Sequence, residues 1–263
     1  VFHNASIGNK LEIVKIQQAM EPIIKELIKD SNKLSKIRKV KMLDHYTLSH
    51  SINVALLATI TGKWLGFSLE ELKELATAGF LHDIGKAMIP IEILNKPGML
   101  TNEEFQIIKK HAIYGYNCLK NTPNISKNIL DGISQHHERM DGSGYPFKLK
   151  AYEIHKYARI IAIVDTFDAI ISKRPYKPKQ SPFKAMEILH SGLFHTLDPH
   201  ICSVFLDNIS ILYTGNTVKL NSNEVGEIVT INKHFPTRPF VKIDDKFIDL
   251  SKNMNYEIVE LMI

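Results

Sequence analysis

Apolar residues recur every three or four positions through most of the first 212 residues, which is the spacing of one face of a helix. The first such run lies between Lys10 and Lys41, where Pro22 marks a kink or a new first turn. A second helix is predicted from Tyr46 to Leu65. Ser68 and Glu71 then have the S-x-x-E spacing of a capping box, which predicts the start of a third helix.

That third helix leads to His82 and Asp83. If it continues as far as Lys86, all three side chains share one face, because Lys86 follows them by four and three residues. Further helices are predicted over residues 125–138 and 153–172, and from the two prolines that follow capping residues, Pro182 and Pro199.

A second capping box, formed by Thr101 and Glu104, predicts another helix between these segments. Its apolar positions turn Phe105, Ile108 and His111 towards the interior. A lone histidine among inward-facing positions is more often a packed side chain than a ligand. His111 is therefore a candidate metal ligand only together with other donors.

After Gly215 the pattern changes to short β-type runs, separated by Asn, Asp, Gly and Pro turns. The predicted strands are Thr217–Leu220, Val225–Ile231, Phe240–Ile243 and Tyr256–Met262. We therefore expect a mainly α protein with an amino-terminal helical segment (1–42), a helical domain (43–214) and a small β appendage of three to five strands (215–263).

The composition is that of an ordinary globular chain, since 44% of the 263 residues are hydrophobic and 23% are charged. The formal charge of +5 favours an anionic partner. The basic residues between positions 29 and 41 alternate with apolar ones, so we interpret them as a solvated helix face and expect no nucleic-acid polymer as partner.

The two cysteines, Cys118 and Cys202, lie far apart and form no CxxC motif, which argues against a disulfide framework or a zinc ribbon. We expect a reducing, cytoplasmic location. No apolar run is long enough to span a bilayer. No secretory signal is recognisable, and a start at Val1 is consistent with a piece of a longer protein.

The candidate chemistry lies in adjacent pairs of histidine and aspartate. His82 and Asp83 form one pair, His136 and His137 form another, and His111 lies between them in the sequence. Imidazole nitrogen together with carboxylate oxygen suits iron, manganese or zinc, whereas calcium and magnesium prefer oxygen alone. The pattern predicts a metal-dependent hydrolase.

Seven side chains of ligand type lie on or at the ends of predicted helices: His50, His82, Asp83, His111, His136, His137 and Asp165. Seven donors exceed one tetrahedral zinc site, so we expect two divalent ions, with Asp83 as the natural bridging carboxylate. Two ions about 3.5 to 4 Å apart can make hydroxide from a bridging water and neutralise charge on a phosphoryl group. Phosphodiester hydrolysis is the reaction that suits such a centre.

These residues belong to motifs that closely resemble the HD-GYP domains, a branch of the HD superfamily of metal-dependent phosphohydrolases. The resemblance extends from about Leu43 to Leu212 and includes residues 82–86, 93–101, 136–146, 159–161, 165–169 and 174–176. It implies a helical bundle and the hydrolysis of the bacterial second messenger cyclic di-GMP to linear pGpG or onward to GMP.

The resemblance also implies a role for each motif residue. His50, His82, Asp83 and Asp165 would hold one ion, and Asp83 would bridge to a second held by His111, His136 and His137. Lys86, paired with Asp168, would lie near the scissile phosphate and stabilise the developing oxyanion. Arg174 and Lys177 would contact substrate phosphates, and Gly144, Tyr145 and Pro146 would shape the substrate site.

Two positions depart from the family pattern. Some members carry a glutamate one turn before the first histidine and hold a third ion, whereas this chain has Tyr46, so we expect two ions, iron or manganese. After Pro146 the usual glycines are replaced, which costs backbone freedom at the rim of the substrate site.

Three alternatives remain open. The same chemistry could act on another cyclic dinucleotide or a nucleotide, or the centre could be a di-iron oxygen or redox sensor, because such sensors use the same donors. The basic groups expected to contact phosphates argue against a sensor. A catalytically silent receptor is disfavoured because no ligand is replaced. The segments that flank the resemblance are interpreted as regulatory or as mediating a homodimer.

Overall fold

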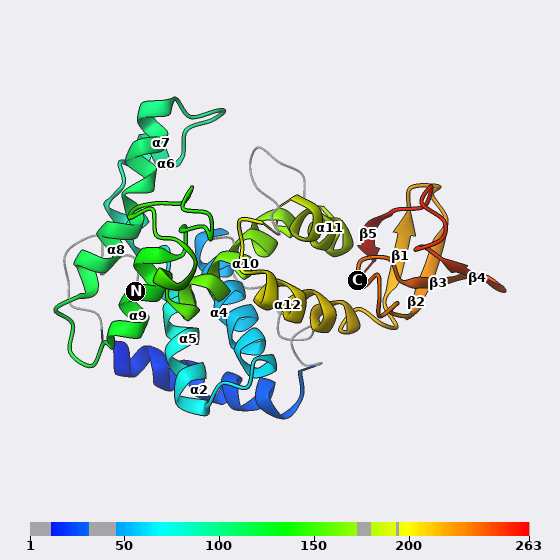
Figure 1. The fold of residues 1–263 in the computed structure, drawn as a ribbon, viewed down its shortest axis with the longest axis horizontal. Coiled ribbons are helices and arrows are strands. Elements are labelled where there is room, and N and C mark those ends of the chain that lie inside the picture. The colour runs from blue at the N-terminus through cyan, green and yellow to red at the C-terminus, as the bar shows by residue number, and fades with distance from the viewer. Residues whose placement is uncertain (1–11, 32–45, 173–179, 193–194, 263) are drawn as a thin grey trace. The chain divides into compact units, whose positions relative to one another are not determined.

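The computed structural model of the chain describes residues 12–31, 46–172, 180–192 and 195–262. The chain divides into two compact units, drawn in Figure 1. The first comprises Val1–Asp165 and His195–Asp198, and the second comprises Thr166–Phe194 and Pro199–Ile263. The boundaries predicted after residues 42 and 214 stay predictions.

The helices predicted over residues 46–65, 125–138 and 153–172 are present, with ends within three residues of those bounds. The regular elements of the first unit that the structure describes are all helical. They are α2 (Ile13–Lys29), α4 (Tyr46–Trp64), α5 (Leu69–Leu81), the 3-10 helix η1 (Ile84–Met88), α6 (Ile91–Leu94), α7 (Asn102–Lys109), α8 (His111–Leu119), α9 (Lys127–Gln135), the 3-10 helix η2 (Ala151–Glu153) and the part of α10 (Lys156–Ile171) up to Asp165. Both predicted capping boxes are present, at the start of α5 and of α7.

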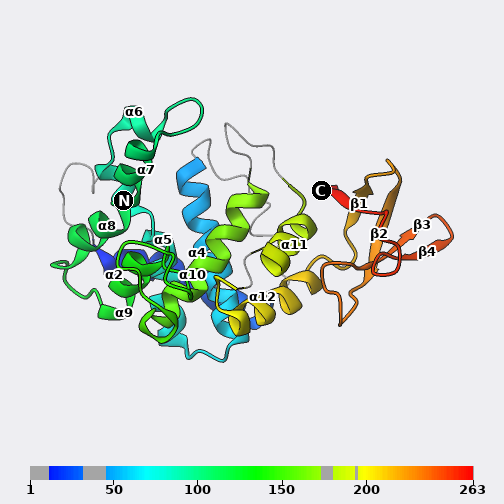
Figure 2. The same ribbon diagram turned by 45° about the horizontal axis from the view of Figure 1, so that its top comes forward.

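Helix α5 lies at the centre of this unit and packs against α2, α4 and α9 (Figures 1 and 2). Its residues Leu75, Ala76 and Ala78 are fully buried. Ile24 of α2 joins Leu72 and Ala76 in one cluster. The small side chains of α5 allow its neighbours to approach closely, which fixes the end of the helix where His82 and Asp83 follow.

The condition under which His82, Asp83 and Lys86 share a helix face is not met, because α5 ends at Leu81 and η1 follows. Gly85 gives the physical reason. A Cβ atom at Gly85 would lie 1.9 Å from the carbonyl oxygen of His111 and 2.4 Å from the amide nitrogen of Gly115. The backbone of η1 therefore touches the backbone of α8, and this contact requires both the tighter turn and the glycine.

The inward orientation predicted for Phe105 is also wrong. The helix that starts at Thr101 ends at Lys109, and a new helix begins at His111. The break leaves His111 buried, while the ring of Phe105 is 44% exposed. Helices α6 and α7 stand together at one end of the unit (Figure 2).

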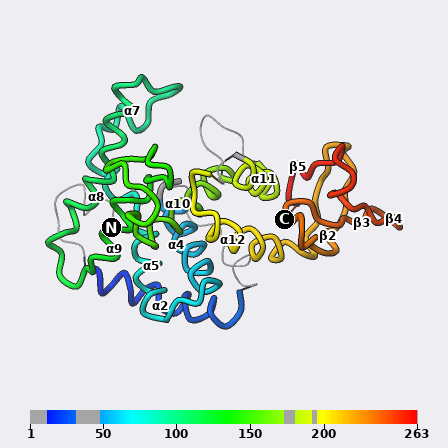
Figure 3. Tube along the Cα trace, viewed as in Figure 1, coloured from blue at the N-terminus to red at the C-terminus, as the bar shows by residue number. Residues whose placement is uncertain are grey.

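The second unit contains the end of α10, α11 (Pro182–Gly192), α12 (Pro199–Ile211) and an antiparallel sheet. The rings of Phe167 and Phe205 meet at 5.2 Å. The sheet has five strands in the order β4-β3-β2-β1-β5. Figure 3 traces the chain through this carboxy-terminal part. They are β1 (Thr217–Leu220), β2 (Val225–Thr230), β3 (Phe240–Ile243), β4 (Lys246–Asp249) and β5 (Ile258–Met262).

Strand β4 was not predicted. It is an edge strand with no buried residue, and its partner β3 supplies the hydrogen bonds, so the sequence carries little apolar signal there. The mainly α architecture and the β appendage of up to five strands are confirmed. Within the described ranges, no helix combines the length and hydropathy that a membrane crossing needs.

We expect Gly85→Ala to destabilise the protein by at least about 2 kcal/mol, because the added methyl group meets backbone atoms that cannot move aside. Denaturant unfolding measures the change in the free energy of unfolding. Met88→Ala, in the same 3-10 helix at a side chain that is 42% exposed, is the control and should change it by less than about 0.5 kcal/mol. Equal stability of the two variants would contradict the close approach.

Candidate metal centre

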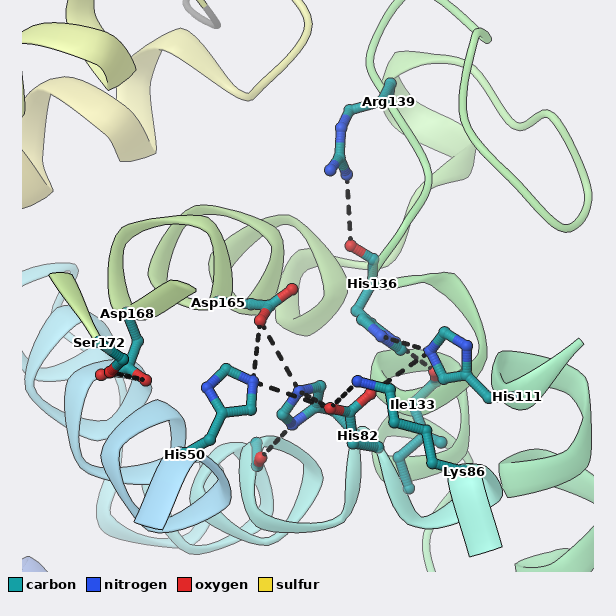
Figure 4. Close-up of polar contacts among 12 residues, drawn as sticks. His50, His82, Lys86, His111, Ile133, His136, Arg139, Asp165, Asp168 and Ser172 are labelled. Atoms are coloured by element: carbon teal, nitrogen blue, oxygen red, sulfur yellow. Dashed lines mark hydrogen bonds and ion pairs between the residues drawn. The ribbon is translucent and has the colours of Figure 1, made fainter. Parts of the chain in front are cut away.

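Two groups of ligand-type side chains come together in the first unit. Figure 4 shows four of their histidines, His50, His82, His111 and His136. One group is His50, His82 and Asp83, and the other is His111, His136 and His137; within each group the donor atoms lie within 4.8 Å of one another. His137 is half-buried and the other five are buried. They come from α4, from the segment after α5, from α8 and from the end of α9.

The carboxylate of Asp83 lies between the two groups. Its Oδ1 is 3.5 Å from Nε2 of His111. Its Oδ2 is 3.3 Å from Nε2 of His82 and 3.7 Å from Nε2 of His50. One oxygen thus faces each group, which is the arrangement that a bridging carboxylate requires.

Asp165 adds the seventh donor from α10. Its Oδ1 lies 3.1 Å from Nε2 of His50 and 3.9 Å from Nε2 of His82, as the dashed lines in Figure 4 show. On the other side, Nε2 of His111 is 3.3 Å from Nε2 of His136. The structure therefore brings together all seven side chains singled out in the sequence.

Three of the histidines are oriented by the same device. In each, Nδ1 lies at hydrogen-bond distance from a backbone carbonyl three residues earlier, and a carbonyl can only accept. The Nδ1 atom therefore carries the proton, and Nε2 presents its lone pair to the cluster. The contacts are His82 to Gly79 at 2.7 Å, His111 to Ile108 at 2.7 Å, and His136 to Ile133 at 2.6 Å.

The surroundings set the charges that metal ligands need. Burial lowers the pKa of His111, and burial together with the neighbouring imidazoles lowers the pKa values of His136 and His137 well below the usual range, which keeps these rings neutral. Burial alone would raise the pKa values of Asp83 and Asp165. For Asp83, the positive charge of Lys86 outweighs burial and lowers the pKa. For Asp165, hydrogen bonding and charge from His50 lower the pKa, and both carboxyls stay ionised.

The ligand atoms fit a cation because several of them are hydrogen-bond acceptors that face one another. Nε2 of His82 is buried and has no hydrogen-bond partner among the described residues, although a carboxylate oxygen lies 3.3 Å away. The Nε2 atoms of His111 and His136 face each other at 3.3 Å, and both have Nδ1 committed to a carbonyl. Lone pairs held this close in a buried site repel unless a positive charge lies between them.

Lys86 brings a positive charge to the edge of the cluster. Its Nζ lies 2.5 Å from Oδ2 of Asp83, and its side chain is 30% exposed. Asp168 is buried and accepts a hydrogen bond from the hydroxyl of Ser172 at 3.1 Å. The pairing of Lys86 with Asp168 stays a prediction. Arg174, Lys177 and the side chain of Tyr46 lie outside the described residues.

The glycine-rich loop after His137 covers one side of the cluster. A Cβ atom at Gly144 would lie 2.4 Å from the amide nitrogen of Arg139 and 2.4 Å from Cα of Glu138, so only glycine fits there. The ring of Tyr145, whose peptide bond to Pro146 is cis, stacks on the ring of His137 at 4.7 Å. Burial raises the pKa of the Tyr145 phenol, which therefore stays protonated.

Glu138 is the structural residue that sequence reasoning missed. It is buried, and its two carboxylate oxygens accept the backbone N–H groups of Phe147 at 2.6 Å and Leu149 at 3.0 Å. The signal was present, since an acidic residue directly follows the paired histidines. Residue type alone favours a surface carboxylate at such a position, because glutamate is seldom fully buried.

Comparisons with known proteins find a matching family model and several similar proteins. A family model described as an HD domain matches residues 22–201. A cyclic di-GMP phosphodiesterase of Pseudomonas aeruginosa is 31% identical over 262 residues, which cover 96% of this chain and 63% of that protein. A cyclic di-GMP phosphodiesterase of Thermotoga maritima is 38% identical over 191 residues, covering 71% of this chain and 50% of that protein.

A 3'3'-cGAMP-specific phosphodiesterase of Vibrio cholerae serotype O1 is 37% identical over 169 residues, covering 64% of this chain and 39% of that protein. The chain thus spans less than two-thirds of each of these relatives. Among solved structures, an HDG"Y"P protein from Bdellovibrio bacteriovorus matches with a TM-score of 0.63 at 18% identity, covering 73% of this chain and 62% of that one. The predicted fold class is confirmed.

We expect Glu138→Gln to lower the free energy of unfolding by about 1–3 kcal/mol, because the amide can accept only one of the two buried N–H groups. Denaturant unfolding measures this change. Glu92→Gln, at an exposed position in α6, is the matched control and should have no measurable effect. A Glu138→Gln protein as stable as the control would show that this carboxylate does not hold the loop.

Proposed function

The chain belongs to the HD domain family, and on that premise we propose that it is a metal-dependent phosphodiesterase that hydrolyses cyclic di-GMP to pGpG or onward to GMP. One observation carries the proposal: seven buried or half-buried nitrogen and oxygen donors converge, with lone pairs facing lone pairs across the carboxylate of Asp83. This donor set suits divalent transition ions.

In this proposal the donors hold two ions, iron or manganese. His50, His82 and Asp165 would ligate one, the second group of histidines would ligate the other, and Asp83 would be shared. When bound, two such ions lower the pKa of a water molecule and offset the charge that develops on a phosphoryl group. The full ligand sets would be His50, His82, Asp83 and Asp165 for one ion, and Asp83, His111, His136 and His137 for the other.

The remaining residues would position the phosphodiester. The ammonium group of Lys86 is partly exposed beside Asp83 and can reach a substrate oxygen, where its charge stabilises the transition state. Arg174 and Lys177 would contact the substrate phosphates, and Asp168 would orient Lys86. The loop of Gly144, Tyr145 and Pro146 would shape the site on the side of His137.

The choice of substrate draws on the relatives, two of which carry cyclic di-GMP in their names. A second candidate is the same hydrolysis of a mixed cyclic dinucleotide, because a relative of similar identity is specific for 3'3'-cGAMP. Both substrates offer the same phosphodiester to the donors, so the centre alone does not separate them. Cytoplasmic location and a homodimer stay predictions from the sequence.

Removal of metal should abolish hydrolysis, and Asp83→Asn should lower kcat by at least about 100-fold in metal-replete protein, because the shared ligand loses its charge. Chromatography of the cyclic di-GMP reaction products, with metal analysis of the same samples, provides the measurement. Asp245→Asn, an exposed carboxyl in the turn before β4, is the control and should retain wild-type activity. Hydrolysis that survives both chelation and Asp83→Asn would refute the proposal.

The specificity constant should be highest for cyclic di-GMP when cyclic di-GMP, 3'3'-cGAMP and cyclic di-AMP are compared with one metal-loaded preparation. The expectation follows from the relatives that cover most of this chain. A higher kcat/KM for 3'3'-cGAMP would favour the second candidate. Activity on none of the three substrates would rule out both candidate functions.

A further inference from the structure

A column of rings and one ammonium group extends outward from the cluster along the first unit. The ring of Tyr145 stacks on His137 at 4.7 Å. The Nζ atom of Lys109 lies 5.3 Å from the centre of the Tyr145 ring and 4.8 Å from the centre of the Phe105 ring. The column therefore links the candidate metal centre to the exposed end of α7.

Lys109 has no carboxylate within ion-pair distance among the described residues. By contrast, Lys96, in the same region, is paired with Glu104 at 2.7 Å. The two rings hold the ammonium group of Lys109 in place by cation–π contacts. Its positive charge is therefore kept next to Phe105 without a carboxylate partner. The flexible lysine stem lets the ammonium group move from the ring face to the edge of a base that stacks there.

Phe105 is the second unusual residue of the column. It lies one helical turn before Lys109, and its ring is 44% exposed, although its apolar position predicts burial. An exposed aromatic ring beside an ammonium group matches one chemical group of a cyclic dinucleotide, the base. Nucleobases stack on aromatic side chains whatever their identity.

The cation would add selectivity between purines. Guanine presents O6 and N7, which both accept hydrogen bonds, and lysine is a common partner of this pair. Adenine presents an amino group in place of O6, and an ammonium group cannot donate to it. A lysine at the edge of a stacked purine therefore favours guanine.

We propose that Phe105 and Lys109 form a guanine subsite, in which Phe105 stacks on a base of the substrate and Lys109 distinguishes guanine from adenine. The proposal rests on the proposed function, since it assigns a purine-containing substrate to the same site. It makes Lys109 a specificity-determining residue. It gives Phe105 a role that packing does not explain.

The test compares the binding of GMP and AMP to metal-loaded protein by titration calorimetry. Wild-type protein should bind GMP more tightly than AMP. Lys109→Met should weaken GMP binding roughly 5- to 100-fold and leave AMP binding nearly unchanged, whereas Lys109→Arg should retain the preference for GMP. Phe105→Leu should weaken both nucleotides by a similar factor, because stacking does not depend on the base.

Lys110→Met is the matched control, since it removes the same charge from the next, exposed residue and should change neither affinity. Equal weakening of GMP and AMP by Lys109→Met would mean that Lys109 contacts phosphate, and the guanine subsite would be wrong. No weakening of either nucleotide would also overturn it. So would loss of bis(p-nitrophenyl) phosphate hydrolysis in Lys109→Met, because that substrate has no base and such a loss would report a damaged metal centre.

The same set of measurements distinguishes a failure of this inference from a failure of the proposed function. Wild-type protein that cleaves bis(p-nitrophenyl) phosphate but no cyclic dinucleotide would contradict the proposed substrate, while the GMP and AMP affinities would still test the subsite. Wild-type protein that hydrolyses cyclic di-GMP yet binds GMP and AMP equally would leave the function intact and reject the guanine subsite.

Discussion

The candidate site depends on one buried carboxylate shared between two groups of imidazoles. Asp83 faces His111 with one oxygen and His82 with the other, at 3.5 and 3.3 Å. Burial disfavours its charge, and the positive charge of Lys86 beside it restores that charge. A buried carboxylate and several lone pairs held together are unfavourable by themselves, so the fold maintains an arrangement that a cation would stabilise.

The fold maintains this arrangement through backbone contacts more than through side-chain packing. Gly85 lets η1 touch the backbone of α8, which brings Asp83 and His111 together. Backbone carbonyls of the preceding helical turns fix the rings of His82, His111 and His136. Gly144 and the carboxylate of Glu138 hold the loop that places Tyr145 on His137. Each of these contacts supports the ligand geometry without belonging to the ligand set.

Ligand chemistry and helical spacing were sufficient to predict the seven donors and both capping boxes, because these depend on residue type and local spacing. What the sequence left open or predicted wrongly depends on contacts that local spacing does not determine. The end of α5 at Leu81 follows from the approach of α8 to Gly85, and the exposure of Phe105 follows from the break before His111. The sequence of strand β4 contains little apolar signal, because the strand buries no residue and is held by its pairing with β3.

The most direct test of the central claim is anomalous diffraction from crystals of the protein grown or soaked with Mn²⁺. Two peaks should appear in the cluster, both within coordinating distance of Asp83, one among His50, His82 and Asp165 and the other among the second group of histidines. A single peak, or two peaks of which one lies away from Asp83, would contradict the shared carboxylate on which this account depends.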